Sequence, residues 1–251
     1  MMKIGILGAM LQEVELIKEL MVINDISSIA NRVYYQGTIG KHEVVLTFSR
    51  WGKVASSSTT TTLINTFGVE FVIFTGVAGA VSQELNIGDI VVGNGFYQHD
   101  MDARPFFNQF HVPLTDSIVF EPHAEHVSKA MIASQKFLNT INTVIPEELL
   151  NKHSIYKPVV YEGLVASGDK FVSAPSLHQD LSYTKGNKIT LAVEMEGAAI
   201  AQVCSEHNTP YLVIRTISDK ADHSAAIDFQ AFVDQIASHY SSGILREYLE
   251  L

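Results

Sequence analysis

Two glutamates, Glu194 and Glu196, lie between an apolar run that predicts a strand and an apolar run that predicts a helix. A charged side chain is costly in such surroundings unless a partner or a ligand satisfies it. Because residues two apart share one face of an extended segment, both carboxylates can point into one cleft while Met195 lines another wall. Paired carboxylates suit ribose hydroxyls, a metal ion or acid–base chemistry. The alternative for Glu196 is a helix-capping role.

Two further acidic residues follow predicted strands. Glu13 begins a predicted helix just after a strand over Lys3–Gly8, and Asp219 follows a strand over Tyr211–Ile217. In open α/β sheets, ligands bind at the carboxyl ends of the strands. We therefore expect both residues to lie with the two glutamates at one edge of the sheet. The alternative for Glu13 is a first-turn carboxylate that serves only the helix dipole.

The elements that position these residues alternate between strand and helix. This alternation predicts one α/β domain over residues 1–251, built as a three-layer α/β/α sandwich with a mixed central sheet. Periodicity predicts strands over Lys3–Gly8, Arg32–Gly37, His42–Phe48, Glu70–Thr75, from Ile87–Val92 to near Tyr97, Val159–Ala166, Lys188–Val193 and Tyr211–Ile217. It predicts helices over Glu13–Leu20, Ala55–Phe67, His123–Phe137, Pro146–Lys152, Ser176–Tyr183 and Phe229–Leu249, the last with a core stripe of Phe232, Val233, Ile236, Tyr240, Ile244 and Tyr248.

Composition narrows the ligand and the setting. The 251 residues carry a net charge of -10 with only 17 basic residues, which excludes the electrostatic footprint of a nucleic-acid binder and favours a small neutral or cationic ligand. Cys204 is the single cysteine, so no intrachain disulfide can form, and a reducing, cytoplasmic location is expected. No apolar run approaches the roughly 20 residues of a membrane span, and no signal-peptide cleavage pattern follows the apolar start, so no membrane association is expected.

Metal-ligand side chains occur in two places. His99, Asp100 and Asp102 resemble hard-metal ligands, and His123 and His126 lie one helical turn apart. Their spacing matches no specific metal signature, so we expect no metal site.

Two loops between these elements carry unusual residues. Arg50 and Trp51 precede Gly52-Lys53 at the start of a Ser/Thr-rich helix, and composition favours a core anchor for the only tryptophan over a ligand platform. The strand over Glu70–Thr75 runs into Gly76–Ala80, which is expected to form a glycine-rich loop whose N–H groups approach a ligand closely.

Several short motifs resemble the 5'-methylthioadenosine/S-adenosylhomocysteine nucleosidases of the purine nucleoside phosphorylase superfamily. In order along nearly the whole chain they are Ile4–Met10 with Glu13, Gly52–Val54, Thr75-Gly76 with Ala78-Gly79, Val165–Asp169 with Phe171, Ala192–Glu196, and Arg215 with Ile217–Asp219. The resemblance implies a nucleoside phosphorylase-like fold. It also implies hydrolysis of the N-glycosidic bond of methylthioadenosine and S-adenosylhomocysteine, without a cofactor, to adenine and the 5-substituted ribose.

The resemblance further implies a role for each site residue. Glu13 would activate the water, Asp219 would protonate adenine N7, and Glu196 would hold the ribose hydroxyls. Phe171 would stack on adenine, and the Val172 backbone would read its edge. The other substrate-binding residues would be Trp51, Val77, Ala78, Gly79, Glu194, Met195, Arg215, Ser218 and Phe229, with Met195 and Phe229 along the sugar. The family forms homodimers, in which the loop from Phe106 to Pro113 would close the partner's 5'-substituent pocket.

The proposed acid needs an altered pKa. An unperturbed Asp has a pKa near 3.9 and is seldom protonated at neutral pH, so Asp219 must be desolvated or lie near other carboxylates, and the acidic cluster is expected to supply this. The chain departs from the usual family sequence at Arg50-Trp51, where Gly-Ile is usual, and at Val77, where a serine is usual.

Two other functions stay open on the sequence. One is a phosphate-dependent purine nucleoside phosphorylase, for which Arg50 would help to bind the anion. The other is a non-catalytic nucleoside-binding or surface-interaction module. Within the nucleosidase reading, the sequence does not rank methylthioadenosine, S-adenosylhomocysteine, 5'-deoxyadenosine or an aminofutalosine-type nucleoside as the substrate.

Overall fold

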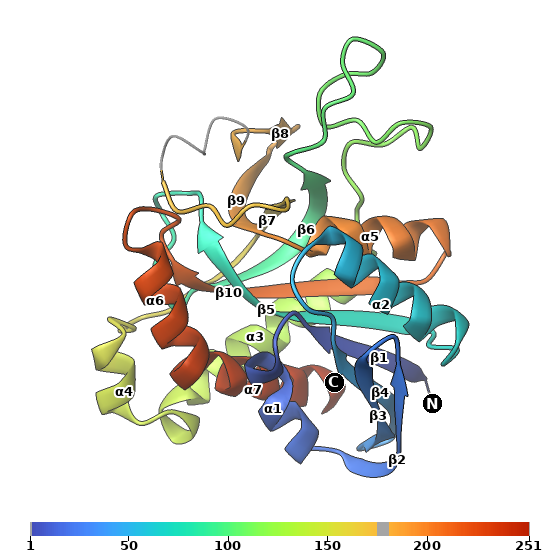
Figure 1. Ribbon diagram of the computed structural model, residues 1–251. Coiled ribbons are helices and arrows are strands. Elements are labelled where there is room, and N and C mark those ends of the chain that lie inside the picture. The colour runs from blue at the N-terminus through green and yellow to red at the C-terminus, as the bar shows by residue number, and fades with distance from the viewer. Residues whose placement is uncertain (1, 175–180, 251) are drawn as a thin grey trace.

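Strands and helices alternate through the computed structural model, which describes residues 2–174 and 181–250 (Figure 1). The strands are β1 (Lys3–Gly8), β2 (Val22–Ile29), β3 (Arg32–Ile39), β4 (His42–Phe48), β5 (Phe71–Ala80), β6 (Ile90–Gln98), β7 (Val160–Ser167), β8 (Thr184–Lys185), β9 (Lys188–Glu194) and β10 (Tyr211–Asp219). The helices are α1 (Leu11–Glu19), α2 (Lys53–Asn65), α3 (Ala124–Val144), α4 (Glu147–Lys152), α5 (Gly197–Glu206), α6 (Ala225–Phe232), the π-helix η2 (Val233–Ala237) and α7 (Ser238–Glu250).

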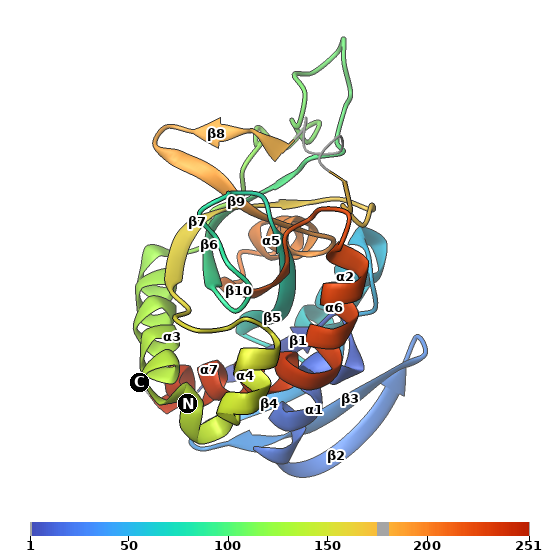
Figure 2. The ribbon, with the colours of Figure 1, turned by 90° about the vertical axis from the view of Figure 1, so that its left-hand side faces the viewer.

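The strands form one mixed sheet in the order β2-β3-β4-β1-β5-β10-β6-β7-β9-β8. Parallel pairs such as β1–β5 and β5–β10 occur beside antiparallel pairs such as β6–β10. β9 also pairs with β5, through Gly79 opposite Val193 and Ala80 opposite Ala192. This extra pairing closes β5, β10, β6, β7 and β9 into a ring (Figure 2). The predicted α/β fold with a mixed sheet and flanking helices is confirmed.

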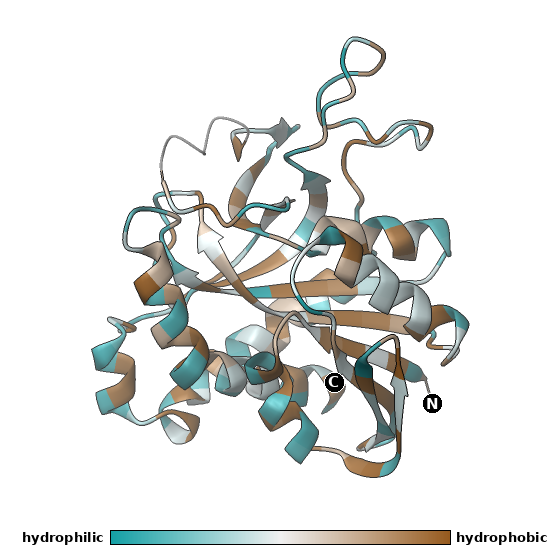
Figure 3. Cartoon of the chain, in the orientation of Figure 1, coloured by the Kyte–Doolittle hydropathy of each residue, from teal (hydrophilic) through white to brown (hydrophobic). Residues whose placement is uncertain are grey.

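Helices cover both faces of the sheet because its central strands alternate their apolar side chains between two cores. In β5, Phe71 and Ile73 join the core that includes residues of α1, α3 and α7, while Val72 and Phe74 join the core that includes residues of α2 and α5. The central strands are apolar along much of their length, whereas the outer helices carry polar residues on their far sides (Figure 3). The central strands of the sheet are therefore buried on both faces.

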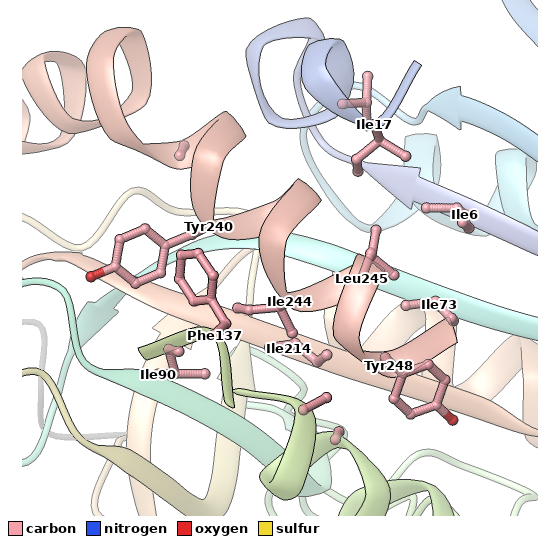
Figure 4. Close-up of a cluster of buried hydrophobic side chains, with 14 of the residues drawn as sticks. Ile6, Ile17, Ile73, Ile90, Phe137, Ile214, Tyr240, Ile244, Leu245 and Tyr248 are labelled. Carbon is pink, nitrogen blue, oxygen red and sulfur yellow. The ribbon is translucent and has the colours of Figure 1, made fainter. Parts of the chain in front are cut away.

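The C-terminal helical segment anchors the first of these cores. All six residues of its predicted stripe are buried, and Ile244 and Tyr248 of α7 lie with Ile73 and Ile214 of the sheet (Figure 4). The predicted continuous helix over Phe229–Leu249 is wrong in detail, because the helical segment begins earlier and the wide turn η2 separates α6 from α7.

Three other segments differ from the prediction. The glycine-rich segment Gly76–Ala80 is strand and not loop, because β10 and β9 pair with it. β2 was not predicted, since its mostly exposed sequence VINDISSI has no alternating apolar pattern. The predicted helix over Ser176–Tyr183 falls mainly on residues 175–180, which lie outside the described residues. In the part of the chain that is described, no helix has the length and apolar character to cross a membrane.

Residues 99–123, between β6 and α3, form a long excursion that extends beyond the sheet (Figures 1 and 2). Phe110 packs against Tyr97 at a ring distance of 5.4 Å and holds its base. Farther out, Phe106 is 86% exposed and Leu114 is 93% exposed. Large apolar side chains on an excursion of this kind are typical of a surface that contacts another molecule.

Candidate active site

A pocket opens where β1, β5, β9 and β10 end. It is lined by Ala9, Met10, Glu13, Trp51, Val77, Ala78, Gly79, Lys170, Phe171, Val172, Val193, Glu194, Met195, Glu196, Ser218, Asp219 and Phe229. Every residue predicted to form the site within one chain is among them, except Arg215. Four lining residues were not predicted as site residues: Ala9, Met10, Lys170 and Val193. Strand ends far apart in the sequence thus meet at one pocket, as the pattern of strand-terminal polar residues indicated.

Glu13 is held at one wall of the pocket by three backbone N–H groups. Its Oε2 accepts hydrogen bonds from Ala9 (2.6 Å) and Met10 (3.0 Å), and its Oε1 accepts one from Val77 (3.0 Å). Gly76 permits this approach, because an added Cβ there would overlap the carboxylate. Burial raises the pKa of Glu13, against the opposing effects of the Arg215 charge and the N–H groups. The carboxylate therefore both caps α1 and faces the pocket.

Arg215 lies buried behind the pocket and is paired with Glu194. Its Nη2 donates to Glu194 Oε2 and lies 3.5 Å from Glu196 Oε2, and its guanidinium carbon is 3.7 Å from the centre of the Phe74 ring. The Glu194 carboxylate also accepts hydrogen bonds from the Ser167 hydroxyl and from backbone N–H groups, including one of 2.8 Å from Gly197. Glu194 is thus occupied by protein partners, and the two glutamates are not equivalent.

Glu196 is the more available member of the pair. Its Oε1 accepts a hydrogen bond of 2.7 Å from the Gly52 N–H. Burial, together with the negative charge of Glu194, raises the pKa of Glu196 to about 8. A carboxyl group that keeps its proton near neutral pH can both donate to and accept from a pair of hydroxyls. Glu196 stands at the N-cap of α5, as the capping alternative expected, but its side chain makes no capping hydrogen bond.

Asp219 is a further buried carboxyl group of the pocket, with only 2% of its surface exposed. Its Oδ1 accepts a hydrogen bond of 2.8 Å from the Ala221 N–H, and its Oδ2 accepts one of 2.8 Å from the Ser218 hydroxyl. Burial raises its pKa against these hydrogen bonds, and the charges of Asp228 and Asp222 add to the rise. The expectation that the other pocket carboxylates raise this pKa is wrong: burial is the main cause.

Three aromatic rings form the rim of the pocket. The Phe229 ring lies edge-on to Trp51 at 5.8 Å and to Phe171 at 5.4 Å. Trp51 is 51% exposed, so its predicted role as a core anchor is wrong. It follows Arg50, whose backbone is left-handed (φ 71°), in the loop just before α2. Such rings offer flat apolar surfaces that suit a purine or an alkylthio group.

A polar network missed by sequence reasoning fixes the loop that carries Phe171. Lys53 Nζ pairs with Asp100 Oδ1 at 2.6 Å, and the Asp169 N–H donates to Asp100 Oδ2 at 2.9 Å. Asp169 Oδ1 in turn accepts a hydrogen bond of 2.8 Å from the Lys53 N–H at the start of α2. The only feature of the sequence that pointed to this network was that Lys53 and Asp169 lie in two of the motifs shared with the nucleosidases, Gly52–Val54 and Val165–Asp169.

The metal-ligand side chains noted in the sequence lie outside the pocket lining. Asp100 pairs with Lys53, and Asp102 pairs with Arg104. His123, Glu125 and His126 come together at the start of α3, with one ligand atom of each within 4.8 Å of the others.

Comparisons with known proteins agree with this geometry. Residues 3–250 match the family model described as the phosphorylase superfamily. The chain is 36% identical over 236 residues to the 5'-methylthioadenosine/S-adenosylhomocysteine nucleosidase of Staphylococcus saprophyticus, covering 93% of each chain. It is 35% identical over 252 residues to the aminodeoxyfutalosine nucleosidase of Helicobacter pylori strain J99, covering 100% of this chain and 99% of that one. The 5'-methylthioadenosine/S-adenosylhomocysteine nucleosidase of Neisseria meningitidis, solved with methylthio-immucillin-A, superimposes with a TM-score of 0.84 at 30% identity and covers 100% of this chain and 99% of its own.

Proposed function

Because the chain belongs to the phosphorylase superfamily, as a purine nucleoside N-glycosyl hydrolase, we propose that it hydrolyses 5'-methylthioadenosine and S-adenosylhomocysteine. The products are adenine and the 5-substituted ribose. We also propose that residues 1–251 form one domain and that the enzyme needs no cofactor. The chain is nearly equally identical to a methylthioadenosine/S-adenosylhomocysteine nucleosidase and to an aminodeoxyfutalosine nucleosidase. The substrate must therefore be inferred from the residues of the pocket.

In the proposed reaction the bond between ribose C1' and adenine N9 breaks, and positive charge builds on the sugar. Asp219 gives its proton to adenine N7, which neutralises the departing base. Glu13 takes a proton from a water molecule whose oxygen forms the new bond to C1'. Glu196 holds the ribose hydroxyls, and buried carboxylates near the sugar stabilise its positive charge. Protons balance, because one leaves Asp219 and one reaches Glu13.

The rim residues account for the rest of the substrate. Phe171 stacks on adenine, the Val172 backbone reads the edge of the base, and Met195 and Phe229 lie along the sugar. Trp51 meets Phe229 at the rim, so we place the 5'-substituent beside these two rings. Val77, Ala78, Gly79 and Ser218 complete the walls, while Glu194 and Arg215 hold each other in position.

One observation carries the choice of water over phosphate: four carboxyl groups, from Glu13, Glu194, Glu196 and Asp219, line the pocket. A phosphate nucleophile needs cationic or N–H donors. Lys170 is the only basic residue in this lining as far as the structure describes it, and the charge of Arg215 is already paired with Glu194. Glu13 would repel the anion, and its neighbouring N–H groups are already bonded to its own carboxylate.

We expect the purified protein to release adenine from methylthioadenosine in a buffer that contains a chelator and no phosphate. The assay is chromatographic separation of adenine and the sugar product. Added phosphate should change neither the rate nor the product. Adenine release that requires phosphate and yields a ribose 1-phosphate would make the protein a phosphorylase, and binding without adenine release would make it a non-catalytic nucleoside-binding module.

We also propose a homodimer in which the excursion from Phe106 to Pro113 closes the 5'-substituent pocket of the partner. Phe106 is 86% exposed and does not line the pocket of its own chain. We therefore expect sedimentation at the mass of a dimer. We expect Phe106→Ala to lower kcat/KM for methylthioadenosine about fivefold, the effect of losing roughly 1 kcal/mol of apolar contact, with no change in thermal midpoint. A fully active monomer would exclude a shared pocket.

A further inference from the structure

A second hollow adjoins the active-site pocket, and the two share Trp51 in their walls. This groove is open to solvent. Arg32, Arg50 and Asp169 are the charged residues that line it. Since Trp51 lines both spaces, a 5'-substituent that extends past this residue from the active-site pocket enters the groove.

Neither arginine of the groove is paired with a carboxylate among the described residues. Arg32 is 92% buried, with a relative exposure of 8%, and its guanidinium donates only to the backbone carbonyls of Ala30, Ser49 and Ala55. The exposed Arg50 donates one hydrogen bond, of 2.6 Å, to the carbonyl of Asn31. Among residues 2–174 and 181–250, neither arginine forms an ion pair, so both charges act on whatever occupies the groove.

Asp169 supplies the opposite charge beside them. Its Oδ1 accepts the Lys53 N–H at 2.8 Å, while its Oδ2 has no hydrogen bond to any described residue. The groove thus offers a guanidinium with unused donors and a carboxylate oxygen with unused lone pairs. An α-amino acid head group, with its carboxylate and its ammonium, has the complementary charges.

We propose that this groove is a subsite for the amino-acid end of the 5'-substituent, with Arg50 binding its carboxylate and Asp169 its ammonium. The inference rests on the proposed nucleosidase function and assigns to it the groove residues that favour its zwitterionic substrate, S-adenosylhomocysteine, over methylthioadenosine. Methylthioadenosine, which ends in a methyl group, gains nothing from the groove. Arg50 is therefore a specificity-determining residue.

The test compares Arg50→Gln with the wild type on three nucleosides. They are methylthioadenosine, S-adenosylhomocysteine, and the 5'-(3-carboxypropylthio) analogue, which keeps the carboxylate but lacks the amine. We expect kcat/KM to fall about threefold to tenfold for the two carboxylates, as for a partly exposed charge pair, and less than twofold for methylthioadenosine. Arg50→Lys keeps the charge and should retain most of the preference. Salt at 0.5 M should weaken the preference in the wild type.

Lys136→Gln is the matched control, because it removes one exposed positive charge on α3. It should leave unchanged the ratio of kcat/KM for S-adenosylhomocysteine to kcat/KM for methylthioadenosine. An unchanged ratio in Arg50→Gln overturns the inference. An equal loss on all three nucleosides also overturns it, since Arg50 would then serve the loop or the dimer.

Binding separates this inference from the proposed reaction. Calorimetry in an Asp219→Asn background measures affinity without turnover, and there Arg50→Gln should weaken only the two carboxylate ligands. Selective weakening supports the subsite even if adenine release were to fail. Equal affinities overturn the subsite alone, and a protein that binds none of the three overturns it together with the nucleosidase function.

Discussion

Asp219→Asn is expected to lower kcat by at least about 10²-fold, because the amide cannot deliver a proton to the departing adenine. A general acid typically contributes a factor of 10² to 10⁴, or roughly 3 to 5.5 kcal/mol of barrier. Binding of an adenine analogue should survive much better than turnover, since the stacking on Phe171 does not involve Asp219. The measurements are kcat with methylthioadenosine and the dissociation constant of the analogue.

The same variant should lose activity without losing thermal stability. Burial raises the pKa of Asp219, so the folded protein holds this proton more tightly than the unfolded chain does. A raised carboxyl pKa favours folding below the unfolded pKa, near 3.9, and this advantage is lost as pH rises through the folded pKa. Asn keeps the acceptor for the Ala221 N–H and carries no charge. We therefore expect a thermal midpoint at pH 7.5 that is equal to the wild-type value or up to about 3 °C higher, with the difference vanishing near pH 4.

Asp25→Asn, on the exposed strand β2, is the control for a simple change of charge and should keep full activity. Turnover close to wild type in Asp219→Asn would remove this residue from the proposed mechanism. A lower thermal midpoint with normal turnover would reassign it as a purely structural carboxylate.

Glu13→Gln is expected to reduce kcat by at least about 10²-fold, because the amide cannot take a proton from water. Unlike Asp219→Asn, it should also destabilise the fold. Both oxygens of Glu13 accept backbone N–H groups, from Ala9 and Met10 on one side and Val77 on the other. The amide NH₂ must face one of these donors, which costs about 1 to 3 kcal/mol and is partly offset by the loss of a buried charge.

Glu15→Gln provides the matched control, since Glu15 lies on the same helix but is exposed. It should leave both kcat and the thermal midpoint unchanged. If Glu13→Gln loses stability but turns over normally, the carboxylate serves only as the cap of α1. Measuring the two properties together distinguishes a capping residue from a general base.

Much of the pocket could be predicted because its chemistry lies where strands end. The apolar runs of β1 and β10 are short, bounded and rich in β-branched residues, so their ends and the acidic residues that follow were evident from sequence. The resemblance then added the aromatic residues. The roles of Glu13 and Asp219, the dimer and the assignment of residues 1–251 to one domain stay predictions.

The rest depends on contacts between distant parts of the chain. Sequence placed Glu194 and Glu196 in one cleft but could not show that Arg215 would occupy Glu194 and leave Glu196 available. The network that joins Lys53 to Asp100 spans 47 positions and has no local pattern. Trp51 was misplaced because its exposure depends on the conformation of the loop before α2, which composition does not reveal.

The pairing of β5 with β9 has a consequence for the order of folding. Gly79 and Val193 are opposite one another in the ring yet far apart in the sequence, so this contact has a high entropic cost of loop closure and is expected to form late. Until it forms, a chain can hold all its helices and most of its strands while the pocket walls from β5 and β9 stay apart. Recovery of catalytic activity after refolding should therefore lag behind recovery of secondary structure. The Val81 N–H, bonded to the Leu191 carbonyl at 2.8 Å beside this pairing, should become protected from hydrogen exchange only as activity returns.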